Sequence, residues 1–135
     1  MIFAHDKSVV HTVPRGKTRI VVGEGSGEET VSVWEQWFDP GGYIPLHYHD
    51  EQEILVLLSG EVTFTLDGEA SSVRAMSTIV VPPRAVHGMR PSGSDDVHLL
   101  VMFPVAAPKI YAPDGRLRPL PWEDHSVDSD LSPSS

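Results

Sequence analysis

Short stretches of β-branched, aromatic and alternating apolar residues follow one another from residue 8 to residue 103, and turn residues separate them. The stretches that predict strands are residues 8–13, 18–22, 31–38, 62–66, 69–74, 78–81 and 97–103. Asp67-Gly68 favours a tight hairpin, and no amphipathic helix of about ten or more residues precedes the tail. Strands this short at this spacing predict an all-β sandwich or barrel rather than a parallel α/β sheet.

Two histidines and a glutamate stand just before an apolar run at residues 54–58. His47 and His49 are two positions apart, so in a strand their side chains share one face, with Cα atoms about 6 to 7 Å apart. Glu53 can join them if the strand continues or returns through a short turn. Because the chain has no cysteine, imidazole and carboxylate are its strong metal ligands, and this spacing predicts a metal site.

A fourth candidate ligand, His87, follows a β-branched run that is broken by Pro82-Pro83. A double proline is expected to end the strand near the mouth of a site. Sequence spacing alone does not bring His87 to the other three residues.

Residues 41–60 resemble the first motif of the cupin superfamily, written G-x5-H-x-H-x3,4-E-x6-G. The match is complete and falls on Gly41, His47, His49, Glu53 and Gly60. The second cupin motif, G-x5-P-x-G-x2-H-x3-N, is kept in part. Pro82 and His87 match it, whereas Met76, Arg84 and Pro91 stand where glycine, glycine and asparagine are usual.

The resemblance covers about residues 30–104 and implies a small single-domain metal-binding cupin, or monocupin. The implied fold is a double-stranded β-helix, or jelly-roll barrel. The resemblance also implies that His47, His49, Glu53 and His87 hold one divalent metal ion, with Fe, Zn, Mn and Ni as candidates, and that the protein forms a homodimer.

The chain of 135 residues is near the usual size of one domain, and residues 1–104 are assigned to a single barrel. Residues 105–125 are rich in proline and predict an extended arm that lies across the barrel or on a partner subunit. Residues 126–135, rich in serine and aspartate, predict a disordered tail.

Four further residues are weaker candidates for the site. His98 is a candidate general base if it shares an inward face with Leu100 and Met102, although the opposite face of that strand is the more apolar one. Tyr43 is a second catalytic candidate by position. Arg84 and Gln36 are candidates for binding the substrate, Arg84 because a guanidinium can pair with a carboxylate through two hydrogen bonds.

Four protein ligands on an ion that prefers six leave two adjacent positions for an oxygen-rich substrate, or for a substrate together with dioxygen. A non-haem iron dioxygenase is therefore the first functional hypothesis. A redox-inert ion would instead support an isomerase, cyclase or lyase. A non-enzymatic module that binds a small molecule is the alternative from another class.

Charge and hydropathy exclude other partners. A formal net charge of −9 without a basic stripe opposes binding to nucleic acid. The N-terminus lacks the pattern of a signal peptide, and the apolar run at residues 54–58 is too short to span a membrane. A cytoplasmic protein without a membrane partner is expected.

Overall fold

The computed structural model describes residues 1–28 and 30–123, and strands dominate this part of the chain. The elements in chain order are η1 (His5–Lys7), β1 (Val10–Val13), β2 (Gly16–Val22), β3 (Ser32–Phe38), β4 (Ile44–His47), β5 (Glu53–Ser59), β6 (Glu61–Leu66), β7 (Glu69–Arg74), β8 (Ser77–Val81), β9 (His87–Pro91), β10 (Val97–Phe103), β11 (Ile110–Tyr111) and β12 (Leu117–Arg118). The prediction of an all-β fold is confirmed. Within the described ranges, no helix has the length and apolar character needed to cross a membrane.

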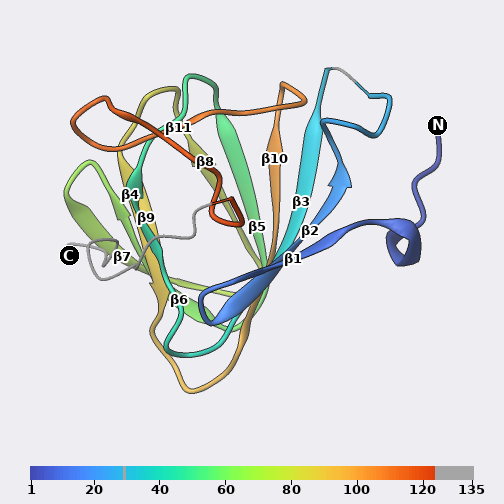
Figure 1. Cartoon of the computed structure of the whole chain (residues 1–135). Helices are drawn as coiled ribbons and strands as arrows, with labels where there is room; N and C mark the ends of the chain where they lie inside the picture. The colour runs from blue at the N-terminus through green and yellow to red at the C-terminus, as the bar shows by residue number, and fades with distance from the viewer. Residues whose placement is uncertain (29, 124–135) are drawn as a thin grey trace.

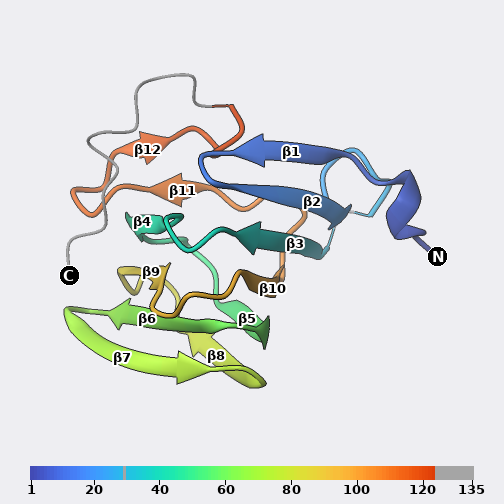
Figure 2. The ribbon, with the colours of Figure 1, turned by 90° about the horizontal axis from the view of Figure 1, so that it is seen from below.

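Two antiparallel sheets face each other and form the walls of a jelly roll (Figures 1 and 2). One sheet has the strand order β1-β2-β3-β10-β5-β8, and the other has the order β4-β9-β6-β7. From β3 to β10 the chain passes repeatedly from one sheet to the other, so residues that are distant in sequence meet between them. A bridge between Tyr48 and Tyr111 places the β11–β12 hairpin, which is a separate two-stranded sheet, beside β4.

Buried and half-buried side chains alternate along the strands, and the buried ones fill the space between the sheets. In β10 the odd-numbered residues, from Val97 to Phe103, are at most 3 % exposed, whereas the even-numbered ones are half-buried. In β3, Trp34, Gln36 and Phe38 are buried in the same way. Each large apolar side chain buried here stabilises the fold by about 1.5 to 3 kcal/mol.

Strand β9 is one of the elements absent from the strands expected from the sequence. Its sequence, His-Gly-Met-Arg-Pro, contains two residues that weaken strands. The strand forms because it lies between β4 and β6 and pairs with both. Gly88 permits this arrangement, since a Cβ atom there would lie 2.8 Å from the carbonyl oxygen of Ile44.

The segment that follows β10 lies beside β4 (Figure 2). It forms the short strands β11 and β12 where an extended arm was expected. Beyond them, Trp122 stacks on His11 with the ring centroids 4.9 Å apart and meets Trp34 edge to face. The end of the expected arm and the expected disordered tail, residues 124–135, lie outside the described part of the chain.

Candidate metal centre

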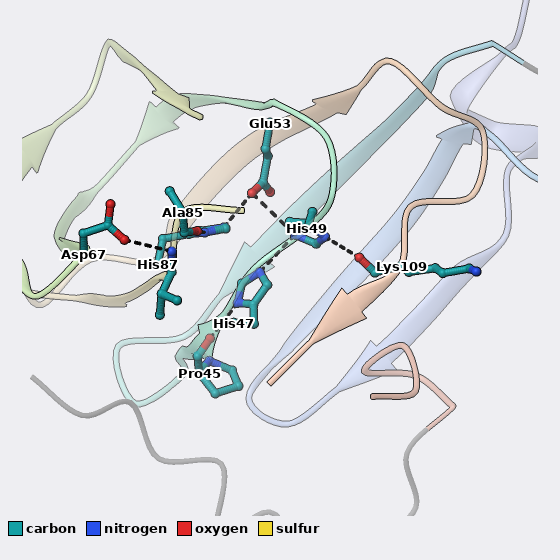
Figure 3. A network of polar contacts seen from close by, with 9 residues as sticks. Pro45, His47, His49, Glu53, Asp67, Ala85, His87 and Lys109 are labelled. Carbon is teal, nitrogen blue, oxygen red and sulfur yellow. Dashed lines mark hydrogen bonds and ion pairs between the residues drawn. The ribbon is translucent and has the colours of Figure 1, made fainter. Parts of the chain in front are cut away.

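Four buried residues converge between the two sheets (Figure 3). His47 ends β4 and lies opposite His87, the first residue of β9. His49 lies in the loop that follows β4, and Glu53 begins β5 in the other sheet. One ligand atom from each residue lies within 4.8 Å of those of the other three. The structure thus brings together all four ligands expected from the sequence, and the set could hold one metal ion.

Each of the three imidazoles is oriented by a backbone carbonyl. The contacts from Nδ1 are His47 to Pro45 at 2.7 Å, His49 to Lys109 at 2.8 Å, and His87 to Ala85 at 2.9 Å. A carbonyl oxygen only accepts hydrogen bonds, so Nδ1 must carry the proton and donate it. In the neutral ring this leaves Nε2 with a lone pair, which is the arrangement that a metal-binding histidine requires.

The atoms that face the centre of the cluster are hydrogen-bond acceptors, so they would bind a cation more favourably than they bind one another. Nε2 of His47 and Nε2 of His49 lie 3.1 Å apart, and in neutral rings with protonated Nδ1 both of these atoms are acceptors. Oε1 of Glu53 lies 2.6 Å from Nε2 of His87, yet both atoms are buried and neither has a hydrogen bond of acceptable geometry. Three nitrogen lone pairs and one carboxylate therefore fit a divalent ion.

The electrostatics of the cluster differ from one histidine to the next. Burial lowers the pKa of His47, and the charges of His87, His49 and Arg118 lower it further. Burial also lowers the pKa of His49, against the opposing effect of Glu53. Burial acts in the same direction on His87, but contact with Glu53 outweighs it and raises the pKa of His87. His47 and His49 are thus held neutral and ready to bind a metal at pH 7.

A cavity of about 120 Å³ opens beside the cluster. Most of its lining is apolar and comes from both sheets, with Trp34, Phe38, Leu55, Phe64, Met89 and Val101 among the lining residues. Besides the four cluster residues, the polar side chains among the described lining residues are Thr18, Gln36, Tyr43 and Arg118. Gln36 donates a hydrogen bond from Nε2 to Oγ1 of Thr18 at 3.1 Å, and both residues line the cavity.

The four weaker candidates divide into two groups. Gln36 and Tyr43 line the cavity, whereas Arg84 and His98 do not. Arg84 is exposed at the rim, where Nη1 donates to Oδ1 of Asp50 at 2.6 Å. A solvated ion pair, rather than a substrate contact, accounts for its position.

His98 lies on the outer face of β10, away from the cluster. Its Nε2 is 2.7 Å from Oε2 of Glu35, and its ring stacks on Trp37 with the centroids 5.0 Å apart. The reason is the parity of the strand, because the more apolar odd-numbered face of β10 is turned inward. The geometry therefore offers no contact through which His98 could act as a general base in this cavity.

Residues of the C-terminal segment complete the site, and the sequence analysis did not anticipate them. Ile110, Arg118, Pro119 and Pro121 line the cavity, and the carbonyl of Lys109 orients His49. A backbone carbonyl leaves no signal in the sequence. The only indication was the proline-rich segment of residues 105–125, which was expected to lie across the barrel or on a partner subunit.

Comparisons with known proteins identify the family of the chain and structures that share its fold. The chain is 30% identical over 94 residues to Auxin-binding protein 1 of Arabidopsis thaliana. The aligned region covers 63% of this chain and 48% of that protein. It therefore spans about half the length of this curated relative.

Two solved structures share the fold. The polyketide cyclase RemF from Streptomyces resistomycificus has a TM-score of 0.69 at 19% identity, over 91% of this chain and 90% of that one. The oxalate decarboxylase of Lactobacillus farciminis has a TM-score of 0.68 at 20% identity, over 76% of this chain and 32% of that one. Residues 34–103, just over half of the chain and including all four cluster residues, match the family described as Cupin domain, and the protein therefore belongs to the cupin family.

Proposed function

We propose that this cupin is a metal-dependent enzyme that acts on a small organic substrate bearing oxygen ligands for the metal. The observation that carries the proposal is the cluster of His47, His49, Glu53 and His87 beside a cavity of about 120 Å³. For comparison, an apolar cavity of about 150 Å³ holds benzene. A buried ligand set next to an enclosed space is a functional site more often than a structural one.

In this proposal, the cluster residues bind the metal and the other residues that line the cavity enclose the substrate. A bound divalent ion would polarise a carbonyl or hydroxyl oxygen or, if redox-active, take up dioxygen. The three carbonyl contacts hold the imidazoles in the tautomer that binds the ion. The apolar walls exclude water, while Gln36 and Tyr43 offer polar atoms to a substrate in the cavity.

Two reaction classes fit this arrangement. Iron in the site supports oxidative cleavage, and a non-haem iron dioxygenase is the first choice. Zinc, manganese or nickel supports proton transfer in an isomerase, cyclase or lyase. The likeness in fold to a polyketide cyclase over nearly the whole of both chains is the reason to keep the second class.

A module that binds a small molecule without turnover is the second candidate function. It is favoured by the 30% identity to a protein whose name describes it as auxin-binding. Outside the four cluster residues, Tyr43 and Arg118 are the titratable side chains among the described residues that line the cavity, which also supports it. The expected homodimer and the expected cytoplasmic location stay predictions.

Elemental analysis of untagged protein, purified as wild type and as His87→Ala, tests the metal site. We expect about one metal ion per chain in the wild type and its loss in the variant. His5→Ala, which removes an exposed histidine far from the cluster in sequence, is the matched control and should retain the metal. Equal metal content in the wild type and His87→Ala, or none in either, would contradict the proposal.

The identity of the metal directs the next measurement. Iron leads to screens for oxygen consumption, whereas zinc, manganese or nickel leads to assays for proton exchange and elimination. Tight binding of small molecules by the metal-loaded protein, without any turnover in these screens, would favour the binding module.

A further inference from the structure

We propose that Arg118 is the anion-binding residue of this cavity and that the substrate or ligand carries a carboxylate. The inference rests on the proposed function, because it takes the cavity beside the metal cluster as the ligand site. It adds the chemical class of the ligand, which neither the cluster nor the family match specifies.

The position of Arg118 on the β11–β12 hairpin directs it toward the cavity. Arg118 lies directly opposite Ile110 in the antiparallel pair, so the two side chains share one face of the hairpin. Both residues line the cavity. The hairpin stands beside β4, the strand that carries His47 (Figure 2), so the face with Arg118 and the metal cluster border the same space.

Among the described residues, the guanidinium of Arg118 has no hydrogen-bond or ion-pair partner, in contrast to those of Arg19 and Arg84. Arg19 lies 3.3 Å from a carboxylate oxygen of Glu35, and Arg84 lies 2.6 Å from Asp50. Arg118 is half-buried, and within residues 1–28 and 30–123 its side chain makes no hydrogen bond or ion pair. A cation beside apolar walls is costly unless it is paired, so an anionic ligand would offset this cost.

The charges around the cavity favour an anion. Among the described residues that line it, Arg118 is the single arginine or lysine, and Glu53 is the single acidic residue. A divalent ion in the cluster would more than neutralise Glu53. The cavity would then be positive within a chain whose formal net charge is −9.

A carboxylate attached to an apolar body fits this environment. The planar fork of a guanidinium pairs with a carboxylate through two parallel hydrogen bonds. The aromatic and aliphatic walls, which include Trp34 and Phe64, suit an apolar body of about the size of one ring. The ligand would therefore present its carboxylate to Arg118, its apolar body to the walls and another oxygen-bearing group to the metal.

Calorimetric titration of zinc-loaded protein tests the inference, with benzoate and phenylacetate as probes and their neutral amides as matched ligands. We expect the wild type to bind the acids at least 10-fold more tightly than the amides. Arg118→Met should weaken binding of the acids by about 10- to 100-fold and leave the amides unchanged, as expected for the loss of a charge-assisted pair. Arg118→Lys should recover part of the difference, because it restores the charge without the fork.

Arg116→Met is the control, because Arg116 is exposed, lies two residues away and does not line the cavity. Its affinities should equal those of the wild type. A wild type without preference for the acids, or an Arg118→Met variant that binds them as the wild type does, would overturn the inference. Zinc content is measured in the same samples, so failure of the metal site is seen separately from failure of Arg118.

Discussion

The carbonyl contact of each histidine is the feature that makes the cluster a ligand set rather than a group of buried polar residues. A protonated Nδ1 on His47, His49 and His87 leaves each Nε2 directed at a common point. Rotation of any of these rings would cost its hydrogen bond. The rings are therefore oriented before a metal arrives, which lowers the entropic cost of binding it.

Metal affinity should fall as the pH is lowered, because protons compete for the Nε2 atoms. His87 has a raised pKa, so it takes up a proton at a higher pH than an ordinary histidine and the loss of affinity should begin above pH 6.5. His47 and His49 have lowered pKa values and resist protonation until the pH is lower. Equilibrium dialysis of zinc between pH 8 and pH 5 measures this. An affinity that stays constant over this range would contradict the assignment of the histidines as ligands.

At the scale of elements, the β11–β12 segment is joined to the barrel at the metal site itself. Backbone hydrogen bonds of 2.9 Å run in both directions between Tyr48 and Tyr111. The hydroxyl of Tyr111 also donates to Asp50 at 2.9 Å. These contacts hold the carbonyl of Lys109 against His49, so the docked segment and the ligand geometry depend on each other.

Tyr111→Pro removes the backbone N–H that pairs with Tyr48, so the segment should dock less firmly and His49 should lose its partner. We expect metal affinity to fall by about 10- to 100-fold, the usual cost of losing a contact that orients a ligand. Competition with a chromogenic chelator measures the affinity.

Lys109→Ala is the matched control for this experiment. The contact of Lys109 with His49 is made by its backbone carbonyl, so replacing the side chain of Lys109 should leave the affinity unchanged. If Tyr111→Pro binds zinc as the wild type does, the segment does not support the site.

At the scale of the whole molecule, the cluster ties the two sheets together. His47 and His87 come from the four-stranded sheet, whereas Glu53 comes from the six-stranded one. An ion held by both would resist separation of the sheets. Without a cation, the Nε2 lone pairs of His47 and His49 would face each other in the interior at 3.1 Å, which destabilises the fold.

Metal binding should therefore raise the melting temperature. Zinc at about 100 times its Kd stabilises the folded state by about 2.7 kcal/mol, which corresponds to roughly 10 °C for a domain of this size. Differential scanning calorimetry with and without a chelator measures the shift, and His87→Ala should not show it. Equal melting temperatures of the wild type in saturating zinc and in chelator would be inconsistent with a metal ligated across the two sheets.

Local pattern was enough to predict the all-β class and the spacing of His47, His49 and Glu53. Strand periodicity and metal-ligand spacing depend on neighbouring residues, so they are visible in the chain itself. The cupin motifs then identified the family and brought in His87.

Packing between segments that are distant in sequence determined the features that the sequence did not predict. The residues His-Gly-Met-Arg-Pro became strand β9 because β4 and β6 lie on both sides of it. His98 was turned outward because the odd-numbered face of β10 buries more apolar surface. Arg118 and the carbonyl of Lys109 reached the site through a hairpin that docks on β4. Such contacts join residues far apart in sequence, and their free energy depends on burial and pairing that exist only once the barrel has formed.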